Sequence, residues 1–241
     1  IDAEHALNPK YMATLGIDLD KLFVAQPMNG EMGLEIAERL IRSGEVALII
    51  VDSVDALIPQ AVVDGEMTDQ YYAPLPRLMG QALRKLKGVT RKSNTCLVFI
   101  NQERSTMATQ GAKKTTSGGA ALRYYADVRI DVVRVGAIKE GANDEVIGQR
   151  VKIAVVASKL APPFKECELD LIYGKGFSQE TDLIDVAVKE GIVSKAGAWY
   201  SYGGERLGHG RNSAAERLKE NPEQMAAIMS AVRQAKGLDH E

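Results

Sequence analysis

Runs of apolar and polar residues along the chain predict its elements. Residues 31–44 (EMGLEIAERLIRSG) and 76–89 (PRLMGQALRKLKGV) repeat apolar positions every three or four residues, which predicts two amphipathic helices. Residues 46–51 (VALIIV) and 95–100 (TCLVFI) are nearly continuous apolar runs, typical of strands buried on both faces of a parallel sheet. Residues 1–11 read as a strand end followed by a loop.

The stretch after the second of these strands has a different pattern of apolar and polar residues. Residues 103–119 (ERSTMATQGAKKTTSGG) have no apolar period and end in Gly-Gly, which indicates a long and functional, or else disordered, loop. Residues 128–136 and 150–159 alternate apolar and polar positions, and we expect two strands joined by a polar hairpin. Residues 168–176 predict another strand.

The pattern changes again near Phe177. Short helical segments surround a compact turn region at 199–211 (WYSYGGERLGHGR), which predicts a second, small domain. We therefore expect an α/β chain with a mixed, mostly parallel sheet flanked by helices at 1–176, and a small α+β C-terminal domain at 177–241. Pro74 and Pro76 are expected to delay the start of the helix that follows them.

Composition excludes several classes of protein. The 241 residues carry a formal net charge of −2, so any nucleic-acid binding must depend on local basic patches. No run of about 18 apolar residues predicts a membrane helix, and no signal peptide is seen. The two cysteines, Cys96 and Cys167, favour a reducing, cytoplasmic setting over a disulfide framework. The chain starts at Ile1 without a Met, which suggests missing upstream sequence.

Polar side chains follow both predicted parallel strands, where ligands bind in open α/β sheets. Asp52 and Ser53 end the first strand, and such an acid holds Mg²⁺ in nucleotide hydrolases; the alternative is a helix N-cap. Gln102 ends the second strand and can sense a phosphate, or simply terminate the strand. Glu4 can activate a water molecule, or be a solvated loop acid. His5 reads as structural.

Basic residues gather around the long loop. Lys113 and Lys114, followed by Gly118 and Gly119, offer charge and bare backbone amides for phosphates. Arg77, Arg84 and Arg104 can extend this patch, although a polar loop beside a solvated helix face is an equal alternative. Farther along, Lys195, Arg206 and Arg211 can contact duplex phosphates or be ordinary surface, and Trp199 is expected to pack the small domain. No G-x-x-x-x-G-K-[ST] phosphate loop occurs in these 241 residues.

Taken together, several stretches resemble the bacterial RecA recombinase family. The matching pieces include IDAEHALNPKY, VDSVDALIP, FINQ, TTSGGAALRYYADVRID, APPFK, YGKG and KAGAWYSY, in family order over nearly the whole chain. The resemblance implies a RecA-type P-loop ATPase core whose phosphate loop would lie upstream. It also implies ATP and Mg²⁺ as cofactors, single- and double-stranded DNA as partners, and a homo-oligomeric helical filament.

The resemblance also implies roles for individual residues. It makes Glu4 the activator of the hydrolytic water, and Asp52, beside Ser53, the acid that holds Mg²⁺ through water. Gln102 would link the γ-phosphate to the DNA loop, and Lys159 would reach the ATP of a neighbouring subunit. The remaining nucleotide-side positions are Asn8, Tyr11 and Tyr173.

For DNA, the resemblance implies two loops, residues 64–72 and 103–119. The DNA-facing residues that it implies are Arg77, Arg84, Arg104, Gly118 and Gly119 in the core, with Lys195 and Arg211 in the small domain; Lys113 and Lys114 make the second loop more basic than is usual. Ala157 replaces a second family lysine, which implies slower hydrolysis. Tyr71 and Tyr72 are unusual and can stack on bases or merely pack.

Three readings of function follow. The first is a DNA-dependent ATPase that catalyses homologous pairing and strand exchange. The second is a DNA-binding or regulatory fragment that hydrolyses nothing because the phosphate loop is absent. The third, another RecA-fold ATPase such as a helicase, is disfavoured by the recombinase-like KAGAWYSY segment.

Overall fold

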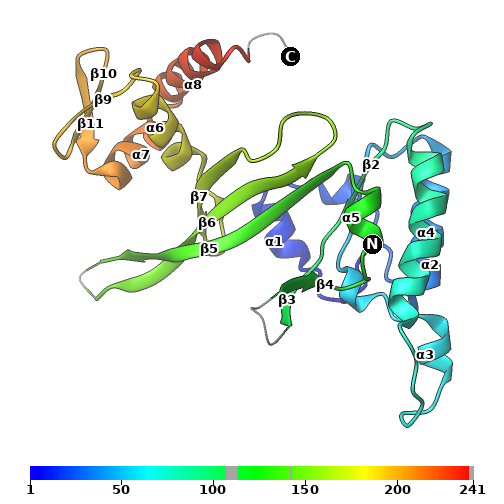
Figure 1. Ribbon diagram of the computed structural model, residues 1–241. Helices are drawn as coiled ribbons and strands as arrows, with labels where there is room; N and C mark the ends of the chain where they lie inside the picture. Colours follow the sequence, from blue (N-terminus) through cyan, green and yellow to red (C-terminus); the bar gives the residue numbers. More distant parts are fainter. Residues whose placement is uncertain (107–112, 142, 239–241) are drawn as a thin grey trace. The chain divides into compact units, whose positions relative to one another are not determined.

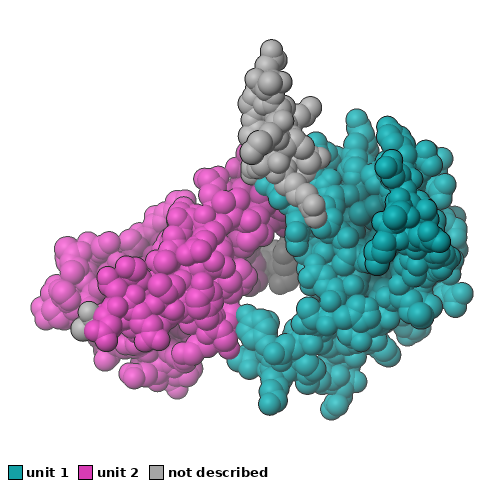
Figure 2. All heavy atoms as spheres, turned by 90° about the horizontal axis from the view of Figure 1, so that it is seen from below, with its two compact units in different colours: residues 1–129 teal, residues 130–241 magenta. Residues whose placement is uncertain are grey.

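The computed structural model describes residues 1–106, 113–141 and 143–238, and the chain forms two compact units. Unit 1 comprises Ile1–Arg129 and unit 2 comprises Ile130–Glu241 (Figure 2). The division by compactness falls near the start of the first strand of the antiparallel sheet, whereas the sequence placed a domain boundary at 176/177. The division into domains 1–176 and 177–241 stays a prediction.

Two long helices form the main layer of unit 1 (Figure 1). Helix α2 (Gly30–Ser43) is capped by Asn29, whose Oδ1 accepts a bond from the Met32 N–H at 2.8 Å, and it ends at Gly44 with φ 74°. Helix α4 (Pro74–Thr90) packs beside α2. The buried core joins both helices to the first strand through Leu34, Ala37, Ile41, Ile49, Val51, Met79, Leu83 and Leu86.

The strands β1 (Leu48–Val51) and β2 (Cys96–Phe99) pair in parallel. Ile49 and Val51 are buried, but Leu48 is 53% and Ile50 is 43% exposed. The expectation of burial on both faces was therefore wrong for the described residues, because the helices cover only the face that carries Ile49 and Val51. An isolated parallel bridge between Asp2 and Asp52 confirms that the chain start lies along the end of β1.

The rest of unit 1 contains short helices. These are α1 (Pro9–Thr14), η1 (Leu19–Lys21), η2 (Val54–Ala56), α3 (Gln60–Asp64) and α5 (Ala121–Tyr125). Helix α1 lies partly in the stretch predicted as a loop. Its apolar residues are too few to make a helical period, so its N-cap, Asn8, and the proline at its first position were the only available signals.

The prolines before α4 do not delay the helix. Pro74 is its first residue and Pro76 its third, so the helix starts earlier than the sequence analysis predicted. The first-turn N–H groups of a helix have no intrahelical partner, so proline loses nothing there. Ala73 precedes the helix with a left-handed φ of 48°, a conformation that a residue with a side chain adopts only rarely.

The long polar loop contains regular structure at both ends. Strands β3 (Glu103–Thr106) and β4 (Lys113–Thr116) pair antiparallel, with Glu103 opposite Thr116. The prediction of an irregular segment across 103–119 was therefore wrong at its two ends. Both strands (ERST and KKTT) consist of polar residues, so the ladder has no apolar period that could reveal it in the sequence. Residues 107–112 lie outside the described residues.

Unit 2 begins with a sheet of the order β5-β6-β7-β8. Its strands are β5 (Val128–Glu140), which starts just before the unit, β6 (Glu145–Ser158), β7 (Glu166–Ile172) and β8 (Gly176–Phe177). The expected strands are confirmed, and they extend well into the predicted polar hairpin. Figure 1 shows β5 and β6 as long neighbouring strands. The β6–β7 and β7–β8 ladders are antiparallel.

The end of the chain builds a second, separate core in unit 2. The elements are α6 (Gln179–Lys189), β9 (Ser194–Ala196), β10 (Trp199–Tyr202), β11 (Glu205–His209), α7 (Arg211–Glu220) and α8 (Pro222–Lys236). Ile184, Leu207, Leu218 and Ile228 are fully buried between the helices and the three-stranded sheet. The α/β class with mixed sheets is confirmed. Within the described residues, no helix is long and apolar enough to cross a membrane.

Candidate nucleotide and DNA site

Glu4 and Ser53 meet at the carboxyl end of β1. The backbone N–H groups of Ala3 and Glu4 donate to the carbonyl of Asp52 at 2.8 and 3.3 Å. Ser53, only 1% exposed, donates from its Oγ to Oε1 of Glu4 at 2.6 Å. The structure therefore brings Glu4, Asp52 and Ser53 together, and it gives the exposed Glu4 carboxylate a buried anchor.

Asp52 and Asp2 are neighbouring acids with opposite surroundings. Hydrogen bonds from Gln26, Ala6 and Leu7 outweigh the cost of burial at Asp2, so its pKa is lowered. Partial burial, and then the charges of Glu4 and Asp2, raise the pKa of Asp52, against the pull of the Ile1 amine. Among the described residues, no donor reaches the Asp52 carboxylate. A cation would relieve this concentration of negative charge.

The acids fit a water-mediated metal rather than a protein cage. In the described ranges, no group of three or more His, Cys, Asp or Glu side chains is placed to hold a metal ion directly. Mg²⁺ usually keeps several waters and binds one or two carboxylates together with substrate phosphates. Asp52 fits that donor set, and the other ligands would come from water and a nucleotide.

Gln102 stands at the same edge of the sheet. The Ile100 N–H donates to Val51 O at 3.0 Å, and the Val54 N–H donates to Ile100 O at 2.9 Å, so the two strand ends are locked together. Asn101 Oδ1 accepts a bond from the Gln102 N–H at 2.8 Å. The exposed Gln102 side chain thus begins the loop beside Asp52 and Ser53.

Asn8 and Tyr11 belong to α1. Asn8 is the N-cap, and its Oδ1 accepts a bond from the Tyr11 N–H at 3.2 Å. The Tyr11 side chain is 40% exposed. Asn8 therefore has a structural task of its own, and it fixes the turn that presents the Tyr11 ring.

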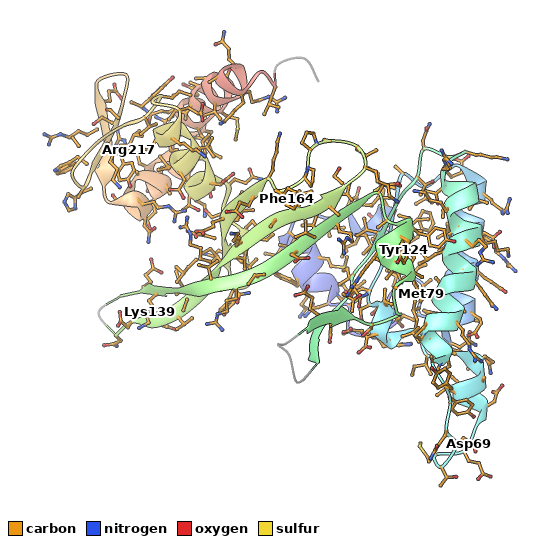
Figure 3. The ribbon with its side chains drawn as sticks, in the orientation of Figure 1. Asp69, Met79, Tyr124, Lys139, Phe164 and Arg217 are labelled. Atoms are coloured by element: carbon orange, nitrogen blue, oxygen red, sulfur yellow. The ribbon has the colours of Figure 1, made fainter. Side chains whose placement is uncertain are left out.

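Gly118 and Gly119 pack the end of the loop against η2 and α4. Both have left-handed φ values, 79° and 77°. A Cβ on Gly118 would lie 2.9 Å from Val54 Cγ1 and 3.1 Å from Cγ of Met79, the core residue of α4 labelled in Figure 3. A Cβ on Gly119 would lie 3.0 Å from Pro76 Cβ. Conformation and space both require glycine here.

The basic residues of α4 divide into two groups. Lys85 pairs with Glu38 at 2.8 Å, and Lys87 pairs with Asp127. Arg77 lies 6.0 Å from the centre of the Tyr72 ring, and Arg84 has no ion-pair partner among the described residues. Two turns separate Arg77 from Arg84, so they share one exposed face. That face offers uncompensated positive charge beside Gly119.

Comparison with known proteins decides the family. Residues 1–178 match the model of the RecA N-terminal domain, and residues 181–237 match that of the RecA C-terminal domain. The chain belongs to the RecA family. The two matches cover the RecA-like segments on which the sequence prediction was based, and that prediction is confirmed.

Individual relatives support the same family assignment. The chain is 51% identical to Protein RecA of Clostridium botulinum (strain Alaska E43 / Type E3) over 239 residues, which is 99% of this chain and 67% of that protein. It is 49% identical to Protein RecA of Acinetobacter baylyi over 235 residues, covering 97% and 67%. The crystal structure of the RadB recombinase aligns with a TM-score of 0.49 at 16% identity, over 73% of this chain and 75% of that chain.

Lys159 and Tyr173, assigned through the RecA resemblance, both lie in unit 2. Lys159 directly follows β6 and is exposed, while Ala157 occupies the strand two residues earlier. Tyr173 follows β7, its N–H donates to Ile147 O at 2.9 Å, and its side chain is 52% exposed. Their roles at a nucleotide stay predictions.

The β9–β10–β11 sheet carries a basic and aromatic surface. Lys195 Nζ lies 5.3 Å from the centre of the Tyr200 ring, and the Arg206 guanidinium lies 4.7 Å from that of Trp199. His209 meets Trp199 edge-on, with ring centres 4.9 Å apart. Trp199 is 41% exposed, so it lies at the surface rather than inside the small domain, where the sequence analysis placed it.

Arg211 has a different environment from Lys195. Its guanidinium donates to Asp185 Oδ1 and Oδ2 at 2.8 and 2.7 Å and also to Asp170, which is only 5% exposed. Burial opposes its charge, but these hydrogen bonds outweigh burial and raise the pKa of Arg211. Arg150 joins the same carboxylates. The structure therefore favours a structural role for Arg211 over the predicted contact with duplex DNA.

Side chains of the loop are described only in part. Arg104, Lys113 and Lys114 lie in β3 and β4, where the backbone pairing is described and the side chains are not. Asp55, in η2, is a residue that the sequence analysis missed. In the sequence it is only an acid three residues after Asp52, and nothing local links it to the loop.

Proposed function

We propose that this RecA-family chain is part of a DNA-dependent ATPase that forms filaments on single-stranded DNA and catalyses homologous pairing and strand exchange in DNA repair. The observation that carries the proposal is the joint placement of Glu4, Asp52 and Gln102 at one sheet edge, where the DNA loop begins. A water activator, a metal-side acid and a phosphate sensor are the groups that ATP hydrolysis coupled to a loop requires.

Asp52 and Glu4 would have different roles in ATP hydrolysis. Asp52 would hold Mg²⁺ through water, and the ion would supply the positive charge that offsets the negative charge of the ATP phosphates during transfer. Glu4, oriented by Ser53, accepts a proton from the attacking water at its second carboxylate oxygen. Tyr11 offers its exposed ring to the base, with Asn8 holding that turn. Tyr173 is the further nucleotide-side residue.

The DNA contacts follow from charge and backbone. Arg77 and Arg84 face phosphates from α4, and the N–H groups of Gly118 and Gly119 contact the strand's backbone. Arg104, Lys113 and Lys114 add charge along the loop. Lys195 receives duplex DNA on the small domain, where Arg206 and Trp199 extend the same surface.

Filament assembly would complete the site. Lys159 reaches the nucleotide of a neighbouring subunit, and Ala157 supplies no second charge there. Because each charge that stabilises the transferred phosphoryl group in trans accelerates hydrolysis, we propose that this chain hydrolyses ATP more slowly than a relative with two lysines.

A second candidate function is DNA binding or regulation without ATP hydrolysis. It would apply if the complete protein has no phosphate-loop motif; none occurs in these 241 residues. The residues upstream of Ile1 discriminate between the two. A G-x-x-x-x-G-K-[ST] motif there supports the ATPase, and its absence supports a DNA-binding or regulatory protein. A helicase-like protein is less favoured, because residues 181–237 match the RecA C-terminal domain.

Nucleotide-dependent DNA affinity tests the proposal. The affinity of the intact protein for a fluorescent single-stranded oligonucleotide would be measured without nucleotide, with ADP, and with a non-hydrolysable ATP analogue. We expect at least tenfold tighter binding with the analogue. Equal affinity in all three conditions would contradict a recombinase in which ATP controls the DNA loop.

A further inference from the structure

Ser117, the last residue before the Gly-Gly pair, is tied by its side chain to η2. Its Oγ donates to Oδ1 of Asp55 at 2.6 Å, and the two residues are 62 positions apart in sequence. Asp55 lies in the middle of η2, a turn of three residues that begins directly after Ser53. The bond therefore joins the end of the DNA loop to the turn that follows Asp52 and Ser53.

Asn101 ties the two ends of the same loop together. Its Nδ2 donates to the Ser117 carbonyl at 2.9 Å, while its Oδ1 accepts the Gln102 N–H at 2.8 Å. One side chain at the end of β2 thus contacts the first residue of the loop region and the residue at which the loop returns. The entry and the exit of the loop are fixed to a common point beside Asp52.

Packing makes the exit rigid. Gly118 follows Ser117 and is buried against Val54, the residue between Ser53 and Asp55. Because the Val54 N–H donates to Ile100 O, η2 cannot shift without disturbing the β1–β2 edge. A movement of Asp52 or Ser53 is therefore carried to Ser117 through side-chain, backbone and packing contacts at once.

We infer that Asp55 and Ser117 are positioning residues. They couple the carboxyl end of β1, where Asp52 and Ser53 lie, to the exit of the DNA loop at Gly118 and Gly119. The inference rests on the proposed function and adds to it a second connection, because Gln102 acts only at the loop entry. A hydrogen bond to an ionised carboxylate is roughly twice as strong as a neutral one. The Asp55–Ser117 contact therefore holds the Gly118 and Gly119 amides in one arrangement when Asp52 is engaged.

The experiment measures coupling rather than affinity. In the intact protein, the ratio of single-stranded DNA dissociation constants without and with a non-hydrolysable ATP analogue would be determined for Ser117→Ala, Ser117→Thr and Asp55→Asn. We expect the ratio to fall about tenfold in Ser117→Ala, to recover in Ser117→Thr, which keeps the hydroxyl donor, and to fall partially in Asp55→Asn.

Ser93→Ala is the matched control. It removes a serine hydroxyl that donates to the Thr90 carbonyl at 3.1 Å, near the far end of α4 from the loop. The ratio should stay at the wild-type value in this variant. If Ser117→Ala does not fold, Asp55→Asn gives the deciding comparison with Ser93→Ala, because it keeps the size of the side chain.

The outcomes separate this inference from the proposed function. A wild-type ratio well above one that is unchanged in Ser117→Ala and Asp55→Asn would overturn the coupling role and leave the recombinase proposal standing. Equal weakening of DNA binding with and without the analogue would show a merely structural role and also overturn it. A wild-type ratio of one would overturn both proposals.

Discussion

Ser53 holds Glu4 through a 2.6 Å hydrogen bond that spans 49 residues of sequence. The donor is buried at the end of β1, and the acceptor belongs to an exposed loop. A carboxylate on a loop samples many orientations unless a rigid element restrains it. The bond therefore gives Glu4 a fixed direction, which its proposed role as water activator requires.

Removal of the Ser53 hydroxyl is expected to slow hydrolysis without weakening nucleotide binding. A hydrogen bond to a charged group contributes about 1.5–3 kcal/mol, so we expect kcat in Ser53→Ala to fall about tenfold or more, with little change in KM. Steady-state ATPase assays on the intact protein check this. Ser43→Ala, which removes a hydroxyl at the end of α2, should behave as wild type. A normal kcat in Ser53→Ala would show that Glu4 needs no anchor.

Asp52 should make stability depend on pH. Its folded-state pKa is raised above 3.8, first by burial and then by Glu4 and Asp2. The native state therefore holds the proton more tightly than the unfolded state, so ionised Asp52 destabilises the protein above its raised pKa and does so less as the pH falls toward 3.8. Asp52→Asn is expected to raise the melting temperature at pH 7, and the difference should vanish near pH 4.

Thermal unfolding of both proteins across this pH range, without Mg²⁺, is the measurement. Addition of Mg²⁺ should stabilise the wild type more than Asp52→Asn, because the ion relieves the repulsion among the acids. An Asp52→Asn variant that is less stable than wild type at pH 7 would contradict the assignment.

Arg84 and Lys85 are adjacent on α4 and provide a matched pair. Lys85 is compensated by Glu38, whereas Arg84 has no ionic partner in the described part of the chain. Arg84→Ala should weaken single-stranded DNA binding and lower the slope of log affinity against log salt by about 0.7, as expected for one lost phosphate contact. Lys85→Ala should leave the slope unchanged. Titrations at four salt concentrations check this, and equal effects of the two changes would place DNA elsewhere.

Arg211 and Lys195 should separate stability from DNA binding. Arg211→Ala leaves the 5%-exposed Asp170 without its closest cation, and we expect a loss of about 3 kcal/mol in the free energy of unfolding. Lys195→Ala should leave stability unchanged and weaken duplex DNA binding. Urea unfolding and duplex titrations give the two readouts. A stable Arg211→Ala variant with impaired duplex binding would restore the family-based role of Arg211.

The sequence analysis anticipated most elements because they carry a clear apolar period or a continuous apolar run. The helices at α2 and α4, the strands β1, β2, β5 and β6, and the helical small domain all follow from such patterns. Helix α1 and the β3–β4 ladder escaped because caps and hydrogen bonds, not buried faces, hold them. Exposure of Ile50 was equally invisible, since a strand's own residues do not reveal which of its faces is covered.

The candidate site likewise has features that the sequence could predict and features that only the structure shows. Motif spacing placed Glu4, Asp52 and Gln102, because the topology of parallel strands brings their carboxyl ends to one edge. The pairing of Ser117 with Asp55 and the engagement of Arg211 by Asp170 and Asp185 depend on contacts between distant segments. No local pattern encodes them, so only the structure could distinguish Arg211 from Lys195.

ATP hydrolysis by Glu4→Gln is the most direct test of the central claim. The intact wild-type protein should hydrolyse ATP much faster with single-stranded DNA than without it. Because a positioned general base contributes about 10²–10⁴-fold, Glu4→Gln should lose at least 100-fold in the DNA-stimulated rate and still bind ATP. Glu35→Gln, at an exposed position of α2, serves as the control. Normal hydrolysis by Glu4→Gln would contradict the account.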